Sequence, residues 1–332
     1  MTKTRLTKKA LLLISLSITL VLLLSACGGS GGANTSGANT GGGAGSAGTS
    51  GGSTSSGTTA TTTGSTSSNF DASRDISIIA REDGSGTKSA FMEIIGLRGK
   101  ADPEKVIIQT GTAGVLAEVK GNPAAIAYES LGYVTSDVKM LKVDGVEATV
   151  ANIKNGSYKI SRPLSVVYQE SSIDNDLNQA FFNFLQSSDA QEIISDSGYV
   201  SIVDGASAYT INGALSGSID ISGSTSLQPL MIDLASAFED LQSNVQVNVS
   251  GGGSGTGYKN ADDGVSEFGM ISEEFDITKA PGCTHYIVSK DGIAVIVNGD
   301  NPLDDISMAQ LSTIYDVDAD EEAITKWDAL IK

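Results

Sequence analysis

Residues 218–241 read SIDISGSTSLQPLMIDLASAFEDL and contain a strand, a turn and a helix in immediate succession. Ser218 to Ile221 has the short apolar character of a strand, and Ser222 to Ser226 consists only of Gly, Ser and Thr. From Leu227 onward, apolar residues recur at the three- and four-residue spacing of an amphipathic helix. A strand that leads through a tight turn into a helix is the building unit of α/β folds, so this stretch predicts that class.

The same design occurs twice more, where residues 251–257 read GGGSGTG and residues 83–87 read DGSGT. A helix N-terminus carries unpaired backbone N–H groups and a partial positive charge, so it can hold an anion, and glycines allow close approach. Each turn taken alone is equally explained as a capped helix after a tight turn. Three such turns, one with Arg81 four residues before Ser85, favour a site for an oxyanion.

The rest of the chain also alternates short apolar strands with helical stretches, and the region from 70 to 332 is long enough for two lobes. The pattern predicts strands at 76–80, 106–108, 125–128, 139–143, 164–168, 245–249 and 293–297, and helices at 88–97, 174–187 and 307–315. Ser307 is expected to cap the last of these helices.

Composition excludes several classes of function. The net charge of −18 argues against binding nucleic acid or anionic lipid headgroups. A Walker loop requires Gly-Lys directly before Ser or Thr, and Gly257-Tyr258-Lys259-Asn260 breaks that pattern; residues 251–257 do not fit the dinucleotide pattern either. With a single His and no acidic cluster beside the turns, a phosphate-ester hydrolase remains only a minor alternative. We therefore expect a protein that is not an enzyme, without metal or cofactor.

The N-terminal segment predicts export. Four positive residues precede an apolar run from Ala10 to Leu24, which is short for a membrane span, and the run ends in Leu24-Ser25-Ala26-Cys27. This end resembles a lipobox, which predicts a signal peptide at 1–26 and acylation of Cys27; an ordinary signal peptide is the alternative. Residues 27–69 are rich in Gly, Ser and Thr and without charge, so we expect a disordered tether to the extracytoplasmic face of a cell membrane.

Three segments resemble the substrate-binding protein of the high-affinity phosphate transporter: ISGSTSLQPL (221–230), GGGSGTGYKNADDGVSEFGMIS (251–272) and AREDGSGTKSAF (80–91). The resemblance spans nearly all of 76–332. It implies a two-lobed α/β fold of the periplasmic-binding-protein type II class, closing over one inorganic phosphate. It also implies a membrane permease of an ABC transporter as the partner.

The segments come in an unusual order, because the Arg-x-Asp-Gly-Ser-Gly-Thr segment, normally near the middle of that family, stands first here. The order predicts a circular permutation in which residues 204–217 join the family's old ends. A fragment of a tandem pair is the alternative. Permutation would place 70–160 plus 288–332 in one lobe and 161–287 in a second, continuous lobe.

Carried over by position, the resemblance implies eight phosphate-binding residues, of which Arg81 is the only cation. Asp83 is expected either to orient Arg81 or to serve only its own turn. The full set is Arg81, Ser85, Gly86, Thr87, Thr225, Ser226, Ser254 and Ser272.

Ser272 stands where some relatives have a carboxylate that accepts the proton of hydrogen phosphate and repels sulfate. The following residue, Glu273, stands where others have Arg, and we expect it to be solvated rather than a ligand. Binding of sulfate, molybdate or tungstate therefore remains an alternative, as does a surface sensor or adhesin that keeps the fold.

Overall fold

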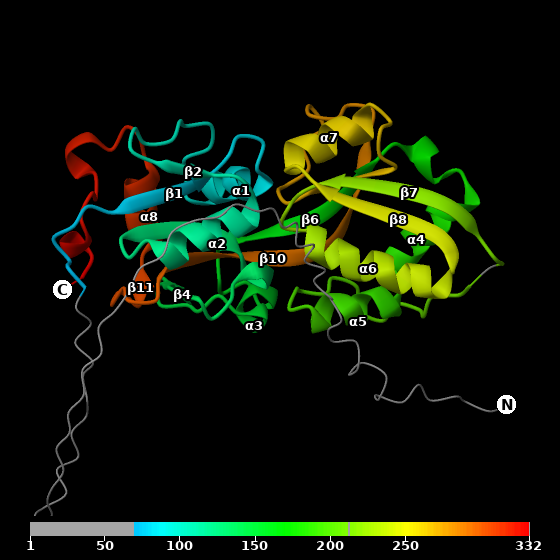
Figure 1. The fold of residues 1–332 in the computed structure, drawn as a ribbon, viewed down its shortest axis with the longest axis horizontal. Helices are drawn as coiled ribbons and strands as arrows, with labels where there is room; N and C mark the ends of the chain where they lie inside the picture. Colours follow the sequence, from blue (N-terminus) through cyan, green and yellow to red (C-terminus); the bar gives the residue numbers. More distant parts are fainter. Residues whose placement is uncertain (1–69, 212, 332) are drawn as a thin grey trace, which may run out of the picture. The chain divides into compact units, whose positions relative to one another are not determined.

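The computed structural model describes residues 70–211 and 213–331 and confirms the predicted α/β class (Figure 1). One nine-stranded mixed sheet has the order β2-β1-β3-β10-β6-β9-β7-β8, with β4 paired to β10, and β11 pairs with β5 separately. The predicted signal peptide, Cys27 and the tether lie outside the described residues.

The strands of the described part are β1 (Ser77–Arg81), β2 (Ile107–Gln109), β3 (Ala125–Ser130), β4 (Val138–Met140), β5 (Lys142–Val143), β6 (Ser161–Tyr168), β7 (Ser216–Gly223), β8 (Asn244–Gly251), β9 (Phe268–Ile271), β10 (Thr284–Asn298) and β11 (Asp305–Ile306). Its α-helices are α1 (Gly86–Ile94), α2 (Gly111–Gly121), α3 (Val150–Lys154), α4 (Asp176–Leu185), α5 (Ser188–Asp196), α6 (Gln228–Leu241), α7 (Ser254–Asp262) and α8 (Met308–Tyr315).

Every strand and helix predicted from the apolar pattern has a counterpart in the structure, and Ser307 caps α8 as predicted, in a reciprocal capping box with Gln310. Helices α2, α3 and α5 and strands β9 and β11 were not predicted, and α2 illustrates the reason. Its sequence, GTAGVLAEVKG, includes three glycines, and only Thr112, Val115 and Val119 are buried, so its apolar stripe is narrow.

Strand β10 is the long element that links the two halves of the sheet. Residues Ile293–Val297 pair antiparallel with β3, whereas Thr284–Gly292 pair antiparallel with β6, with a register shift between Ile287 and Ser289. Because β10 changes partners along its length, it runs from one half of the molecule into the other (Figure 1).

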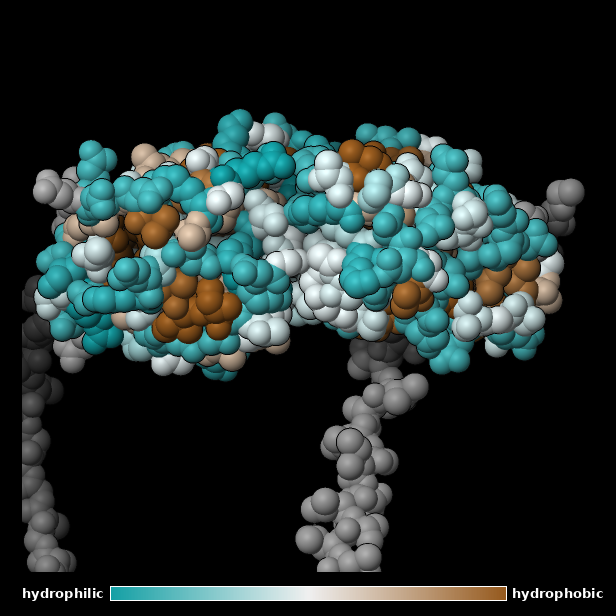
Figure 2. Space-filling view, turned by 90° about the horizontal axis from the view of Figure 1, so that it is seen from above, coloured by the Kyte–Doolittle hydropathy of each residue, from teal (hydrophilic) through white to brown (hydrophobic). Residues whose placement is uncertain are grey.

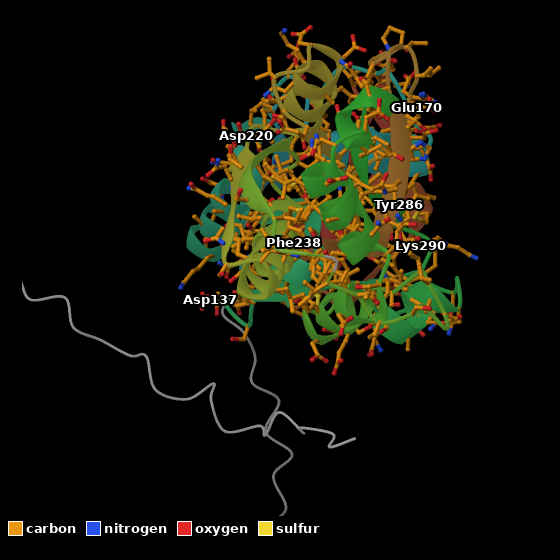
Figure 3. All side chains as sticks on the ribbon, turned by 90° about the vertical axis from the view of Figure 1, so that its right-hand side faces the viewer. Asp137, Glu170, Asp220, Phe238, Tyr286 and Lys290 are labelled. Atoms are coloured by element: carbon orange, nitrogen blue, oxygen red, sulfur yellow. The ribbon has the colours of Figure 1, made fainter. Side chains whose placement is uncertain are left out.

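Two large hydrophobic clusters lie on either side of the point where β10 changes its pairing partner from β6 to β3. One takes residues from 76–160 and 293–330, together with Val200, and the other takes residues from 164–288. Phe238 lies within the second cluster, and Figure 3 shows it inside the packed side chains while Lys290 points outward. Each half thus has a core of its own.

The two ends of the described part lie together. Asp75 and Lys326 form an antiparallel bridge, and the Phe70 ring meets Trp327 edge-to-face at a centroid distance of 5.9 Å. Strand β1, near the beginning, and the end of β10 both belong to the first cluster. Segments from opposite ends of the chain therefore build one core.

Polar side chains cover most of the face shown in Figure 2, and its hydrophobic patches are separate from one another. The large apolar side chains that are exposed come from separate parts of the described chain, such as Ile108 in β2, Ile232 in α6 and Val265 in the loop after α7. Among the described residues, no helix combines the length and the apolar character that crossing a membrane requires.

Candidate functional site

The three Gly/Ser/Thr turns each lead into a helix, and the structure brings the three helix starts together. Ser85 caps α1 by accepting a hydrogen bond from the Lys88 N–H at 3.3 Å. Gly253, whose positive φ of 85° favours glycine, stands at the start of α7. The third turn runs through Thr225 into α6. Three sets of first-turn N–H groups therefore lie near one another, as an oxyanion site requires.

Hydrogen bonds across the two halves show how close the turns are. The Arg81 Nη2 group donates to Thr225 Oγ1 at 2.9 Å, and Thr87 Oγ1 lies 2.9 Å from Ser226 Oγ. The Gly255 N–H donates to the carbonyl of Gly84 at 3.0 Å. The half that contains the first hydrophobic cluster therefore contacts the half that contains the second cluster through side chains that can bind an anion.

Ser254, Ser272 and Gly86 form the other side of the same site. The Ser254 hydroxyl accepts from the Ser272 N–H at 3.0 Å and lies 3.3 Å from the Ser272 hydroxyl. A Cβ atom on Gly86 would lie 2.8 Å from the Ser272 hydroxyl and closer still to that of Ser254. The structure therefore brings all eight sequence-predicted site residues into one region, and seven of them are buried, with Thr225 half-buried.

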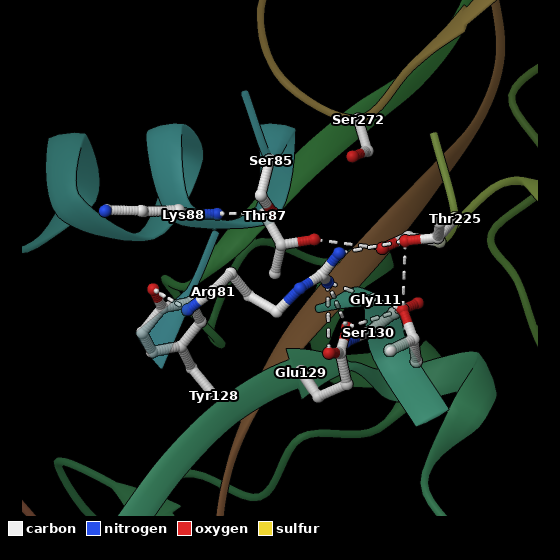
Figure 4. Close-up of polar contacts among 12 residues, drawn as sticks. Arg81, Ser85, Thr87, Lys88, Gly111, Tyr128, Glu129, Ser130, Thr225 and Ser272 are labelled. Atoms are coloured by element: carbon white, nitrogen blue, oxygen red, sulfur yellow. Dashed lines mark hydrogen bonds and ion pairs between the residues drawn. The ribbon is translucent and has the colours of Figure 1, made fainter. Parts of the chain in front are cut away.

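Arg81, at the end of β1, is held by two carboxylates, and Figure 4 shows one of them, that of Glu129. Its Nε and Nη2 groups donate to the two oxygens of Glu82 at 3.0 and 3.1 Å, and Nη1 donates to Glu129 at 3.2 Å. The expectation that Asp83 orients Arg81 is wrong. Asp83 points into solvent and pairs with Lys88, because the turn directs consecutive side chains to different sides.

The two carboxylates differ in their protonation behaviour. Burial raises the pKa of Glu129, and it outweighs the charge of Arg81 and the donors from Ser130 and Thr112, which lower that pKa. For Glu82, burial also raises the pKa, but the hydrogen bond and charge of Arg81 and the backbone donors outweigh it, so the pKa is lowered. Glu129 is thus the carboxyl of this pair that holds a proton more readily.

A second buried ion pair lies where β6 and β10 run side by side. Arg162 donates from Nη2 to Asp291 at 3.0 Å and from Nη1 to the Ser272 carbonyl at 3.0 Å. The Ser130 hydroxyl donates to Asp291 at 2.8 Å, so the pair contacts the residue next to Glu129. The Arg162 Nε group is buried and has no hydrogen-bond partner.

Glu273 differs from expectation. Its side chain is buried rather than solvated, and it accepts a hydrogen bond from Lys279 at 2.9 Å. The carboxylate faces the 273–279 loop, where a lysine compensates its charge. Its neighbour Ser272 faces the candidate site.

Sequence reasoning missed Glu82, Glu129, Arg162 and Asp291. Glu129 had a usable signal, since it is a charged residue in a strand, AIAYES, whose other residues are mostly apolar. Arg162 and Asp291 stand at the edges of apolar runs, where charged residues are usually solvated, so their pairing required the strand register. In the described part of the chain, no group of three or more His, Cys, Asp or Glu side chains is arranged to hold a metal ion.

This chain is similar to known phosphate-binding proteins in both sequence and structure. The "Phosphate-binding protein PstS 2" of Streptococcus pneumoniae is 35% identical over 271 residues, which are 80% of this chain and 90% of that protein. A solved phosphate-binding protein of a phosphate ABC transporter from the same species has 34% identity and a TM-score of 0.62, covering 77% of this chain and 100% of that one. The "Phosphate-binding protein PstS" of Bacillus subtilis is 32% identical over 143 residues, which are 42% of this chain and 45% of that protein.

The chain also matches the PBP superfamily domain over residues 65–189 and 209–331, which include parts of both halves. The alignment with the streptococcal relative likewise extends over both halves of the chain. This chain therefore belongs to the PBP superfamily and, within it, to the family of the PstS phosphate-binding proteins.

Proposed function

We propose that this chain is an extracytoplasmic binding protein that captures inorganic phosphate between its two halves and delivers it to the permease of an ABC transporter. The observation that carries this proposal is the meeting of three helix starts with Arg81 across the two halves. The likeness over most of the chain to a protein named for phosphate binding supports the choice of ligand.

The site has the donors that a tetrahedral oxyanion needs. Thr87, Thr225, Ser226 and Ser254 contribute hydroxyl groups, and the first turns of α1 and α7 contribute backbone N–H groups. Arg81 adds a planar, permanently charged donor. A net charge of −18 repels anions at long range, so these local donors must supply the attraction.

Binding without turnover is the activity that these groups support. Hydrolysis of a phosphate ester would need an activated nucleophile or a bound metal. His285, the single histidine of the chain, is exposed and stacks on the Phe275 ring at 4.5 Å, and none of its described contacts is with a candidate ligand. The hydroxyls of the site therefore have no neighbouring imidazole as a base.

Calorimetry with the purified full chain tests the ligand. We expect phosphate to bind with micromolar or tighter affinity, equivalent to about −8 kcal/mol or more. Sulfate, molybdate and tungstate, titrated in parallel, show whether Ser272 keeps selectivity without a carboxylate. Failure to bind phosphate under conditions where one of the other anions binds would reassign the ligand.

We also propose that acylated Cys27 anchors the chain in the membrane and that residues 27–69 tether it. The Leu-Ser-Ala-Cys sequence and the uncharged Gly/Ser/Thr segment after it support this proposal. Cys27→Ser should release the protein or leave its signal peptide uncleaved. A variant that stays as membrane-bound and as processed as the wild type would show that the anchor is elsewhere.

We infer that the segment order is a circular permutation, with 70–160 plus 288–332 as one lobe and 161–287 as the other. The positions of the two hydrophobic clusters and the adjacent ends support this division. The Bacillus match covers less than half of either chain, as a sequential alignment does when two proteins hold the same halves in opposite order. The streptococcal match over 80% of this chain supports the inference as well, because such coverage is expected when a relative has the segments in the order found here.

Restoring the family's order tests this inference. A chain that begins near Leu215 and joins Ile331 to Phe70 through a short linker should fold and bind phosphate as the natural chain does, because the joined ends are adjacent. Loss of cooperative unfolding in that chain would favour the tandem-fragment explanation.

A further inference from the structure

Glu129 is a buried carboxylate that faces the candidate site from behind Arg81. It is the fifth residue of β3, and its side chain is fully buried. It accepts hydrogen bonds from Arg81 at 3.2 Å, from the Thr112 hydroxyl at 3.2 Å and from the Ser130 N–H at 2.8 Å. In Figure 4 the Arg81 guanidinium is drawn between Glu129 and the hydroxyls of Thr87 and Thr225.

Glu129 is also connected to a candidate ligand through a single hydroxyl. The Thr112 Oγ1 atom that donates to Glu129 lies 3.5 Å from Thr225 Oγ1, which in turn accepts from Arg81 Nη2 at 2.9 Å. Any change of charge on Glu129 therefore acts directly on Arg81 and, through Thr112, on Thr225. Burial reduces screening of this effect by solvent and salt.

The local charges are unfavourable for an anion when Glu129 is ionised. Glu82 already neutralises Arg81 with two hydrogen bonds, and Asp291 neutralises Arg162. Glu129 therefore shares Arg81 with Glu82, so that two cations face three carboxylates in this cluster. An incoming anion would meet a cluster whose net charge is negative, and a proton on Glu129 would make that cluster neutral.

We propose that Glu129 is a specificity-determining residue, which takes up a proton from solvent when an oxyanion binds beside Arg81. The carboxylate becomes a neutral carboxylic acid, and no other bond changes. The number of negative charges that the site accepts then depends on Glu129. This inference rests on the proposed function, because it concerns the same site.

The groups around Glu129 are consistent with uptake by this residue. Those that face it from β1, β3, the turn after β3, β6 and β10 are Arg81, Glu82, Tyr128, Tyr133, Arg162 and Asp291. Both arginines stay charged, and the pKa of each tyrosine is raised by burial, so these four do not accept a proton. Glu82 has a lowered pKa. Burial also raises the pKa of Asp291, but its carboxylate, on β10, already accepts hydrogen bonds from Arg162 and Ser130.

The test compares phosphate affinity in the wild-type full chain and in Glu129→Gln across a pH range that begins near the ordinary 4.5 of a glutamate and extends upward. Titration of phosphate itself affects both proteins equally and cancels in the ratio of their dissociation constants. We expect wild-type binding to weaken relative to Glu129→Gln by up to about tenfold per pH unit, because one linked proton has that effect. At the highest pH, Glu129→Gln should bind at least as tightly as the wild type.

Asp83→Asn is the matched control, since it removes an exposed carboxylate of the same turn that does not contact Arg81. We expect the ratio of its dissociation constant to that of the wild type to stay constant with pH. A purely structural role for Glu129 would instead make Glu129→Gln weaker by the same factor at every pH. That result, with phosphate binding intact in the wild type, overturns this inference and leaves the proposed function standing.

Infrared difference spectroscopy of the wild type gives a second measurement, independent of whether Glu129→Gln folds. Phosphate binding should produce a carbonyl band of a protonated carboxylic acid, which shifts when the glutamates carry carbon-13. Binding without such a band also overturns the inference. If the wild type does not bind phosphate at all, the proposed function fails and this inference fails with it.

Discussion

Arg81 and Arg162 are the two arginines of the described chain whose side chains are only 1% exposed, and each pairs with a buried carboxylate. They differ in what else they contact. Arg81 reaches the hydroxyl of Thr225 in the other half and has two carboxylates, whereas Arg162 holds Asp291 and a backbone carbonyl between two paired strands. Arg81 thus contacts groups that can bind a ligand, whereas Arg162 forms an ion pair between β6 and β10, the strands that connect the two halves. Burial and pairing alone therefore do not distinguish the arginine that we propose as a ligand from the one between the strands.

Breaking the ion pair between Arg162 and Asp291, which links β6 and β10, should have the largest effect, and this effect is on stability. Arg162→Met leaves Asp291 buried without its cation, and we expect the free energy of unfolding to fall by about 3–5 kcal/mol. Urea unfolding measures this loss. Arg98→Met is the matched control, because Arg98 pairs with Glu93 at the surface, and its loss should cost no more than about 1 kcal/mol. An equal loss of unfolding free energy in the two variants would mean that the Arg162–Asp291 pair stabilises the fold no more than a surface pair does.

Removing the ligand-facing arginine should affect binding most. We expect Arg81→Ala to weaken phosphate binding by about a hundredfold or more, equivalent to about 2.7 kcal/mol, since a buried charged partner of the ligand is lost. Thr87→Ala, which removes one hydroxyl beside it, should weaken binding less. Calorimetry of both variants gives the comparison. If Arg81→Ala binds as well as the wild type, the assignment of the site is wrong.

Gly86 tests whether the two halves must approach as closely as the structure shows. Gly86→Ala adds a Cβ that would collide with the Ser254 and Ser272 hydroxyls of the other half. We expect phosphate binding about tenfold weaker, by about 1.4 kcal/mol. Gly299→Ala, where a Cβ meets nothing within 4 Å, should bind normally. Unchanged binding in Gly86→Ala would show that the bound state is more open.

The pH dependence of stability should show the smallest effect. Burial raises the pKa of Glu129 above its ordinary 4.5, so the folded chain keeps this proton to higher pH than the unfolded chain. The stabilisation is full below 4.5 and is lost as the pH rises through the raised value. In that window, we expect the stability of the wild type relative to Glu129→Gln to fall by at most about 1.4 kcal/mol per pH unit.

Urea unfolding in phosphate-free buffers at several pH values measures this difference. Glu82→Gln should show the opposite sign, because the pKa of Glu82 is lowered, and its stabilising contribution is present above its ordinary value and lost as the pH falls through the lowered one. The same slope in both comparisons would mean that the two carboxyls are not distinct.

The local sequence was sufficient for the elements and for the helix starts of the site. Apolar periodicity predicted the strands and helices because the side chains that face a core must recur with the geometry of each element. The Gly/Ser/Thr turns predicted where helices begin, since short polar side chains and glycine are favoured there. A helix such as α2, with glycines and a narrow apolar stripe, was missed because its burial depends on neighbours that are distant in the sequence.

Only the tertiary structure decided which charges meet. Sequence proximity suggested Asp83 as the partner of Arg81, yet Glu82 and Glu129 hold it, and Glu129 is 48 residues away along the chain. The pairing of Arg162 with Asp291 depends on the register between β6 and β10, which brings together residues 129 positions apart. Local patterns determine where a strand or helix forms, because backbone geometry is a local property. The partner of a buried charge is set by packing, because a charge removed from water requires compensation from whichever group the fold brings beside it.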